Sequence, residues 1–517
     1  MPESKSCSGL YSIVIMPSVI AFGGSKNQKV RATWIAGTLL ILFGVFFTAF
    51  WSDILDVLVR KGKAINPTSE AFAIWRQPPF HLNWEITLFN WTNAHEFLAN
   101  RSTKPVFREI GPFAYLEHPS KEDIEFNPSN GTVSYRLRSR YKLDEANCQV
   151  SLNSTINSIN AVALTAANQA RYWGFAAQKA ISIALQSYHQ GVFVTKQASE
   201  LLFDGYREPM LKRGKEILSM MGSSIPLEDR FSWFQIFNDT SETCGYFNMD
   251  LGNEDPDHYA MVKNWNYKAH ADAADEECGK FRGFTGEIFP TRLRKDVPLK
   301  IFTAEMCRMV MFEFEREEEV HGLTGYRFVG TGRSIDNGSL YAENQCNHGG
   351  EFMPSGVINA TECRYGAPFY VSFPHFYMGD SFYHDQMGGM NPEKERHQFY
   401  LIIEPITGLV LKAAVRFQIN VLLQPYPGIE LYENSPRSYV PVLWFSRNFQ
   451  LSQPEIQKLK MLTMVAQLGY GAGFTVLGLG IILALVAYRT SAGMSSQSHI
   501  LLKTAAFPKG HYEPVKS

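Results

Sequence analysis

Two stretches without a charged residue decide the fold class. Residues 32–52, between Arg31 and Asp53, read ATWIAGTLLILFGVFFTAFWS, and the stretch between Lys460 and Arg489 ends in GYGAGFTVLGLGIILALVAY. About 20 apolar residues, at a rise of about 1.5 Å per residue, span the hydrocarbon core of a bilayer. We therefore predict transmembrane helices over residues 32–52 and 465–488.

The overall composition agrees with a membrane protein. The 517 residues include 49 Lys and Arg against 50 Asp and Glu, a balance that argues against nucleic-acid binding. Charged residues make up 19%, below the roughly 25% of soluble domains, and a hydrophobic share of 45% excludes global disorder. No HExxH, GxSxG or GxxxxGK[ST] motif occurs. We therefore expect no enzyme activity, no catalytic residue, no metal and no cofactor.

Flanking charges predict the topology. Lys26, Lys29 and Arg31 precede the first apolar stretch, and Arg489 follows the second. By the positive-inside rule, both tails, residues 1–31 and 489–517, are expected in the cytoplasm. Residues 53–460 would then form one extracellular or lumenal ectodomain.

Glycosylation motifs and cysteines favour the same topology. Seven N-x-S/T sequons all lie between the two apolar stretches, at Asn90, Asn100, Asn130, Asn153, Asn238, Asn337 and Asn359. Six of the seven cysteines lie there too, at Cys148, Cys244, Cys278, Cys307, Cys346 and Cys363. An even number in an oxidising compartment predicts three disulfides, with 15 possible pairings.

The ectodomain changes character along its length. Residues 86–142 and 231–460 have strand-like alternation, including a hairpin from Leu401 to Leu411 with Gly408 in its turn. Residues 154–220 have helical periodicity. Here the apolar stripe Trp173, Ala177, Ile181, Ala184 and Tyr188 is expected to pack against neighbouring helices.

The same helical stretch carries a local excess of positive charge. From Ala146 to Ser199 there is no Asp or Glu, whereas Arg171, Lys179 and Lys196 are present. Such a patch can attract anionic lipid head groups or acidic protein surfaces. The alternative is a modest, solvated face.

Several motifs resemble the class B scavenger receptors. They include the stretch from Gly356 to Pro368, Ser372-Phe-Pro-His375, Gly111-Pro112, Asn391-Pro392 and Ile406-Thr-Gly408. The similarity is greatest to the lysosomal integral membrane protein and insect epithelial membrane protein branch. It implies an α+β fold: one large ectodomain with an antiparallel β-barrel core and an apical helical bundle at about residues 154–235, flanked by two transmembrane helices.

The resemblance also implies a function. Members bind lipids, lipoproteins or other anionic particles, pass lipid through an internal hydrophobic tunnel and support endocytic uptake at plasma and endosomal or lysosomal membranes. The candidate apical ligand-binding residues here are Arg171, Lys179, Tyr188, His189 and Lys196. Two alternatives stay open: a sorting receptor for secreted or lysosomal protein cargo, and an epithelial adhesion protein. Homo-oligomers are also compatible with the sequence.

The resemblance also implies a disulfide pairing, and the C-terminal tail carries a candidate sorting motif. The family pattern pairs Cys307 with Cys363 and Cys278 with Cys346, which leaves Cys148 to pair with Cys244. In the tail, Tyr512-Glu-Pro-Val515 has the form of an endocytic sorting signal, Tyr-x-x followed by a bulky apolar residue.

Overall fold

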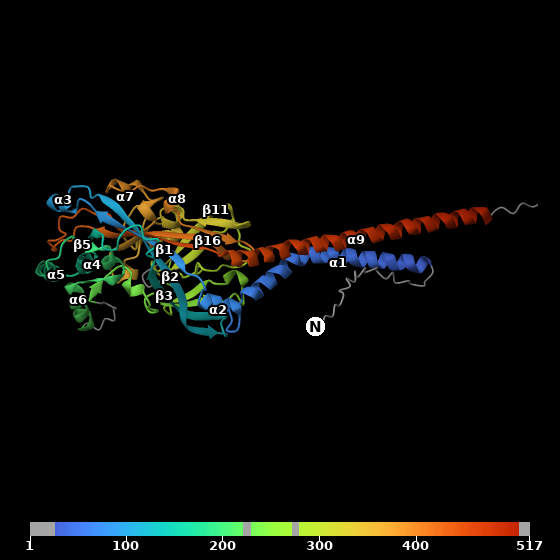
Figure 1. Ribbon diagram of the computed structural model, residues 1–517, viewed down its shortest axis with the longest axis horizontal. Helices are drawn as coiled ribbons and strands as arrows, with labels where there is room; N and C mark the ends of the chain where they lie inside the picture. Colours follow the sequence, from blue (N-terminus) through green and yellow to red (C-terminus); the bar gives the residue numbers. More distant parts are fainter. Residues whose placement is uncertain (1–25, 221–228, 271–278, 506–517) are drawn as a thin grey trace, which may run out of the picture. The chain divides into compact units, whose positions relative to one another are not determined.

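The chain folds as two compact units. The structure is a computed structural model that describes residues 26–220, 229–270 and 279–505 (Figure 1). We call the unit of residues 1–55 and 461–517 the membrane unit. We call the other unit, residues 56–460, the ectodomain, after the predicted topology. Tyr512 and Val515, the predicted sorting signal, lie outside the described residues.

Two long helices form the membrane unit. Helix α1 (Lys26–Lys63) and helix α9 (Gln453–Ala505) are both long and apolar enough to cross a membrane. Within the unit they lie side by side, because glycines allow their backbones to approach closely: a Cβ on Gly44 would lie 2.7 Å from the backbone nitrogen of Leu477. Trp51 Nε1 also donates a hydrogen bond to the carbonyl oxygen of Ala466, at 2.8 Å.

A nearly closed antiparallel sheet forms the body of the ectodomain. Among the described residues it has 13 strands. Eleven follow one path: β10 (Leu299–Thr303), β11 (Arg308–Val320), β12 (Leu323–Val329), β15 (Tyr400–Glu404), β16 (Leu409–Leu423), β17 (Ser438–Gln450), β1 (Leu82–Trp91), β2 (Phe107–Asn127), β3 (Thr132–Leu143), β8 (Tyr246–Asp250) and β9 (Val262–Trp265). Strands β13 (Ile358–Asn359) and β14 (Phe369–Ser372) extend from β16. Phe284 forms bridges to Met261 and Ile301, which brings the two edges together as the predicted barrel requires.

The first and last long strands of the ectodomain are neighbours in this sheet. Strand β1 pairs with β17 on one side, from Asn83 opposite Asn448 onward, and with β2 on the other. The predicted hairpin is also confirmed, because β15 pairs with β16 and Gly408, with φ of 69°, makes the turn between them.

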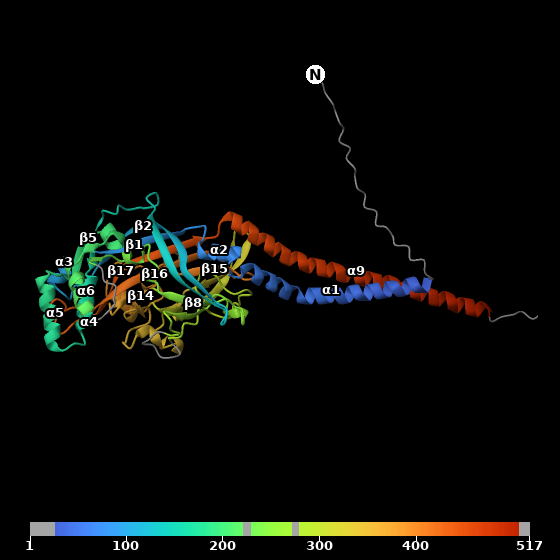
Figure 2. The same ribbon diagram turned by 90° about the horizontal axis from the view of Figure 1, so that it is seen from below.

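Short helices and strands gather at one end of the ectodomain, which we call the helical end (Figures 1 and 2). It comprises β4 (Thr155–Ile159), α4 (Ala161–Ala170), α5 (Phe175–Ser187), β5 (Phe193–Gln197), η1 (Glu200–Asp204), β6 (Tyr206–Arg207), α6 (Pro209–Met220) and β7 (Arg230–Phe231). Helix α2 (Glu70–Arg76) lies at the other end, together with residues 56–63 and 453–460, through which the chain enters and leaves the ectodomain.

The remaining short elements connect the strands. They are α3 (Ala94–Ala99), η2 (Gln235–Phe237), η3 (Pro256–His258), η4 (Gly332–Ile335), η5 (Ala342–His348), η6 (Glu362–Arg364), η7 (Pro374–Phe376), α7 (Ser381–Asp385) and α8 (Lys394–His397).

One large apolar core joins the helical end to the sheet. It packs Trp84 and Trp91 of β1 together with Leu164 of α4, Leu185 of α5 and Leu443 of β17. Each large aromatic side chain buries roughly 150–250 Å². The helical end is therefore an integral part of the ectodomain, supported by the same core as the strands.

Two of the three predicted disulfide pairings, Cys307 with Cys363 and Cys148 with Cys244, lie within the described residues. Cys307 and Cys363 are joined, as predicted, across 56 residues of sequence. Cys346 is disulfide-bonded, while its predicted partner Cys278 lies outside the described residues.

The third predicted pairing is wrong for this structure, because Cys148 and Cys244 are free thiols. The Cys148 sulfur instead accepts a hydrogen bond from the Ala114 backbone N–H, at 3.2 Å, whereas Cys244 packs with the separate apolar cluster around Phe247.

The seven sequons differ in accessibility. Asn100, Asn130, Asn153 and Asn238 are exposed, and Asn90 and Asn337 are partly exposed. Asn359 is only 8% exposed, and its side-chain nitrogen donates to the His348 carbonyl oxygen at 3.3 Å. Because a glycan would be attached to that nitrogen, the fold argues against glycosylation of Asn359 and leaves six candidate positions.

Candidate ligand-binding surface at the helical end

Local sequence explains how the helical end presents side chains to solvent. Asn160 caps α4, its side chain accepting the Ala163 N–H at 3.1 Å, and Asn168 fixes the far end of α4 through a 2.8 Å hydrogen bond to the Gly366 carbonyl. Gly174, in an extended conformation, then separates α4 from α5. The turn over residues 171–174 therefore projects from a fixed support.

Large apolar side chains are exposed on this turn and on α5. The exposed fractions are 80% for Tyr172, 49% for Trp173, 69% for Phe175 and 61% for Ile183. We call these four residues the aromatic surface. Contiguous apolar groups left in solvent are typical of sites that bind another molecule.

The three predicted cationic residues are each placed against an aromatic ring. The Arg171 guanidinium lies 4.5 Å from the Tyr172 ring centre, the Lys179 ammonium 5.6 Å from that of Phe175, and the Lys196 ammonium 4.5 Å from that of Tyr206. Such contacts hold a cation in place without neutralising it.

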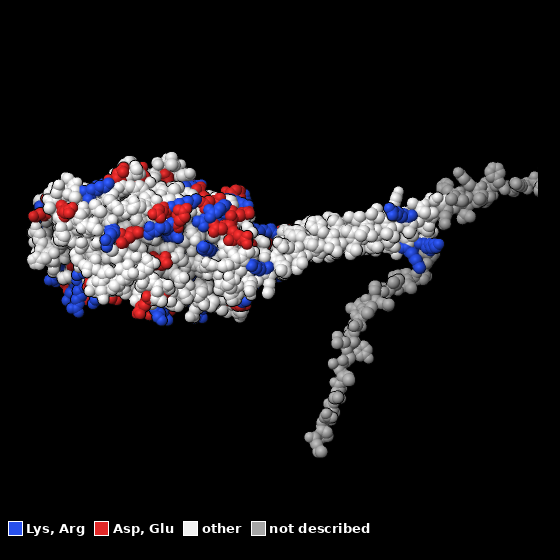
Figure 3. Space-filling view, turned by 45° about the horizontal axis from the view of Figure 1, so that its top comes forward, with Lys and Arg blue, Asp and Glu red and all other residues white. Residues whose placement is uncertain are grey.

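Arg171 is also paired with an acid. Its Nη2 lies 2.6 Å from Glu351 Oε1, and the two side chains are 20% and 22% exposed. The predicted cationic patch is thus weakened at Arg171. Lys179, whose ammonium lies against the Phe175 ring, is the predicted cation that remains beside the aromatic surface. Figure 3 agrees, since Lys and Arg are interspersed with Asp and Glu over the visible face of the ectodomain.

The other two candidate residues follow the end of α5. Tyr188 caps the helix and is partly exposed, and its backbone N–H donates to the Ala184 carbonyl oxygen. His189 is exposed and has φ of 52°, a left-handed conformation that ends the helix. Within the described residues, neither Tyr188 nor His189 forms a hydrogen bond with a residue of the aromatic surface.

The predicted apolar stripe is confirmed in part: Ala177, Ile181, Ala184 and Tyr188 are partly buried, and Ile181 packs against the large apolar core. Ser182 and Leu185 are the buried residues of α5, whereas Trp173 lies before the helix begins and is half exposed. Helical periodicity cannot reveal that a glycine at position 174 interrupts the helix. The local signal for the aromatic surface was the run Tyr172-Trp173-Gly174-Phe175, three aromatic residues around one glycine.

Two cavities lie elsewhere on the ectodomain. One of about 320 Å³ is lined by Arg60, Lys61 and Lys63 together with Leu251 and Tyr259. The other, of about 210 Å³, is lined by Arg76, His118 and Arg140 among others. Both include basic side chains, and neither includes a residue of the helical end.

The fold and the two long apolar helices are those of a membrane protein with one large β-rich unit. Comparison with protein families gives the family: the model of the CD36 family matches residues 35–490, which is most of the chain. The chain belongs to the CD36 family. This confirms the resemblance drawn from the motifs.

Relatives with curated names cover most of the chain. Protein peste of Drosophila melanogaster is 34% identical over 436 residues, covering 84% of this chain and 78% of the relative. Scavenger receptor class B member 1 of Rattus norvegicus is 27% identical over 467 residues, covering 88% and 89%. Lysosome membrane protein 2 of Homo sapiens is 28% identical over 464 residues, covering 88% and 93%. The family thus includes scavenger receptors and a lysosomal membrane protein.

Proposed function

We propose that this protein is a lipid-handling scavenger receptor whose helical end docks on the surface of lipid or lipoprotein particles. The observation that carries the proposal is the aromatic surface, formed by Tyr172, Trp173, Phe175 and Ile183. Trp and Tyr favour the interface between lipid and water, because their rings are apolar and their edges are polar. Lys179, beside Phe175, supplies a positive charge for anionic head groups.

Family membership supports the rest of the proposal. We infer that bound lipid moves within the ectodomain along an apolar path that shields acyl chains from water, a burial worth about 0.8 kcal/mol per CH₂ group. Both tails are cytoplasmic, and Tyr512 and Val515 direct uptake from the plasma membrane to endosomes and lysosomes. The chain acts as a receptor, with no chemistry of its own in this proposal.

Removing the aromatic surface is expected to weaken lipid binding. The triple variant Tyr172→Ser, Trp173→Ser and Phe175→Ser should reduce binding of the full chain to phosphatidylcholine vesicles at least tenfold. Partial insertion of three aromatic rings contributes roughly 1 kcal/mol each, and about 1.4 kcal/mol corresponds to a factor of ten. Vesicle flotation with the protein in lipid nanodiscs measures the change.

Matched controls separate this effect from general loss of apolar surface. Tyr267→Ser and Leu340→Ser change side chains that are also 80% exposed but lie outside the helical end, and both should bind vesicles as the wild type does. Unchanged binding of the triple variant would contradict the proposal. If the triple variant instead loses only a secreted or lysosomal protein from its ligands, the surface is a cargo site.

Lipid is also expected to accompany the purified protein. Native mass spectrometry of the full chain, followed by lipid extraction, should find a reproducible set of lipids that remain bound after exchange into a different detergent. A lipid path inside the ectodomain retains acyl chains because their release exposes apolar surface to water. A protein that is fully glycosylated, folded and free of lipid would exclude internal lipid handling while leaving vesicle docking untouched.

A further inference from the structure

A buried cluster of titratable side chains lies in the ectodomain, outside the helical end. Glu109 of β2, His375 of η7 and His397 of α8 each place one ligand-type atom within 4.8 Å of the others. The two imidazole rings stack, with their centres 4.5 Å apart. The side chain of His375 is 3% exposed, His397 is fully buried and Glu109 is 27% exposed.

Hydrogen bonds fix the protonation of both rings. His375 Nδ1 accepts the Asn391 backbone N–H at 3.0 Å, and His397 Nδ1 accepts that of Glu393 at 2.8 Å. A nitrogen that accepts a hydrogen bond carries no proton, so each neutral ring has its proton on Nε2. His375 Nε2–H donates to Glu109 Oε1 at 2.8 Å, whereas His397 Nε2 is buried with no hydrogen-bond partner among the described residues.

The same hydrogen bonds argue against a metal at this cluster. A metal ligand would need the lone pair of Nε2, but that nitrogen carries the proton in both rings. Metal-bound histidines normally donate from their other ring nitrogen, and here Nδ1 is an acceptor in both cases. In this conformation the cluster holds protons and cannot coordinate an ion through either histidine.

The two backbone donors belong to one short segment, residues 391–398, which we call the latch. On the inner side of the latch, His375 Nδ1 accepts a hydrogen bond from the Asn391 N–H. His397 Nδ1 accepts one from the Glu393 N–H, which precedes α8. Arg396 also reaches inward, with Nη2 3.2 Å from Glu109 Oε2.

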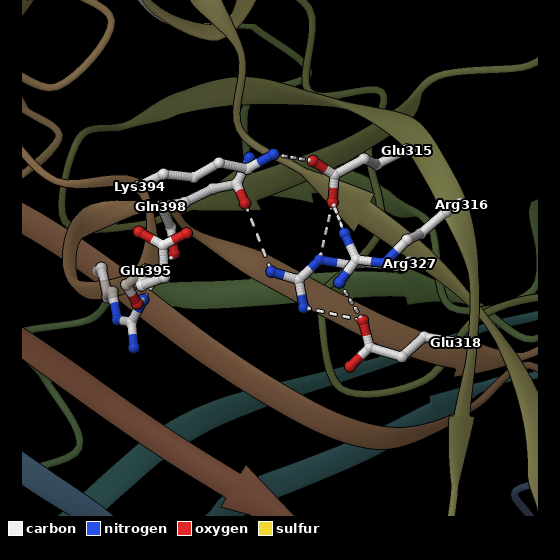
Figure 4. A network of polar contacts seen from close by, with 8 residues as sticks. Glu315, Arg316, Glu318, Arg327, Lys394, Glu395 and Gln398 are labelled. Atoms are coloured by element: carbon white, nitrogen blue, oxygen red, sulfur yellow. Dashed lines mark hydrogen bonds and ion pairs between the residues drawn. The ribbon is translucent and has the colours of Figure 1, made fainter.

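The outer side of the latch is held by ion pairs and hydrogen bonds (Figure 4). Lys394 Nζ lies 2.6 Å from Glu315 Oε1, and Arg327, which joins Glu315 to Glu318, donates to Gln398 Oε1 at 3.3 Å. Partial burial opposes ionisation of Glu315, but the Lys394 hydrogen bond and the charges of Lys394, Arg316 and Arg327 together outweigh it and lower the pKa of this carboxyl. These outer contacts therefore remain charged at mildly acidic pH.

We propose that the latch is a pH-sensitive element that is closed at neutral pH and released when His397 takes up a proton. A protonated imidazole carries N–H groups on both nitrogens, so its Nδ1 can no longer accept the Glu393 N–H. The added charge also enters a buried site where it has no acceptor at Nε2. Both effects favour a conformation in which residues 391–398 move away from His375 and Glu109.

The charged surroundings of His397 agree with this direction. Burial, together with nearby His375 and Arg396, lowers the pKa of His397 to about 3, against 6.5 for an ordinary histidine. Arg416 on β16 acts the same way, and only Glu109 opposes them. His384 on α7 also faces the cluster, with Nε2 3.0 Å from the His375 carbonyl oxygen. Glu109 accepts a further hydrogen bond from Trp444 Nε1.

Glu109 does not titrate in the relevant range. Burial acts to raise its pKa, but hydrogen bonds from His375 and Trp444 outweigh burial and lower the pKa to about 2. The closed latch thus binds fewer protons than the open one between pH 6.5 and 3. Its stability is complete above pH 6.5 and declines as the pH falls through this window, with the open population rising up to about tenfold per pH unit.

Hydrogen–deuterium exchange of the full chain in lipid nanodiscs tests the latch. After correction for the intrinsic exchange rate, protection of residues 391–398 should fall about thirtyfold between pH 7.4 and 5.0. Protection of the β16 peptide, residues 409–423, should not change. Equal protection of the latch at the two pH values would overturn the proposal.

Two substitutions identify the sensor. In His397→Asn the amide oxygen can still accept the Glu393 N–H but cannot be protonated, so the pH response should shrink to less than threefold. His321→Asn, at an exposed histidine, should keep the thirtyfold response. A His397→Asn variant with the full response would show that His397 is not the sensor. If that variant does not fold, imidazole C2–H exchange on the wild type decides: an apparent pKa of His397 near 6.5 overturns the proposal, and one below 5 supports it.

Discussion

Replacing both Cys307 and Cys363 by alanine is expected to destabilise the ectodomain by about 4 kcal/mol. The disulfide closes a sequence separation of 56 residues, and a loop of this length loses that much chain entropy when it is cross-linked in the unfolded state. For an ectodomain of this size, such a loss lowers the midpoint of thermal unfolding by about 5 °C. Differential scanning fluorimetry of the purified full chain measures the shift.

The free thiols provide the matched control. Cys148→Ala removes only the weak acceptor of the Ala114 N–H and should shift the midpoint by about 1 °C or less. Alkylation of the denatured, unreduced protein should modify Cys148 and Cys244 and leave Cys307 and Cys363 unmodified. A peptide in which Cys148 is linked to Cys244 would contradict the structure at this point.

A methyl group at Gly389 is expected to be about as damaging as loss of the disulfide. Gly389 has φ of 92°, and a Cβ built there would lie 1.9 Å from the carbonyl oxygen of Phe107. The positive φ costs about 1 to 2 kcal/mol and the backbone shift about 1 to 3 kcal/mol, so Gly389→Ala should destabilise the ectodomain by about 4 kcal/mol. Thermal unfolding followed by fluorescence measures the change.

Gly350→Ala separates these two contributions. Gly350 has a similar φ of 80°, but nothing lies within 4 Å of its built Cβ. This variant should therefore lose only about 1 to 2 kcal/mol, from its backbone conformation. Equal destabilisation of the two variants would show that the contact with Phe107 yields easily and that the junction between residues 106–107 and 388–389 is loosely packed.

Elements with strong local signals were predictable from the sequence. The charge-free stretches indicate the apolar helices because charge is costly in a bilayer. They did not indicate where the helices end: α1 continues to Lys63, since Arg60 and Lys61 are good helix formers outside a bilayer as well. The hairpin at Gly408 was predictable because one glycine and the flanking apolar alternation specify it locally.

Features that depend on distant residues were not predictable in the same way. Glu109 is 266 positions from His375, and the sequence carries no pattern that relates them. The family motifs around His375 and Asn391 indicated membership but gave no role to either residue. The burial of Asn359 was likewise hidden, because a sequon describes three residues and burial is decided by the packing of η5 against them.

The pairing of β1 with β17 has a consequence for proteolytic release of this unit from a membrane. Because each end of the ectodomain continues into its own apolar helix, one proteolytic cut in a surface loop leaves both fragments joined to a helix. The two fragments also stay hydrogen-bonded to each other along β1 and β17. Release of the unit therefore takes two cuts, one between α1 and β1 and one between β17 and α9. A protease that makes a single cut is expected to nick the protein without releasing this unit.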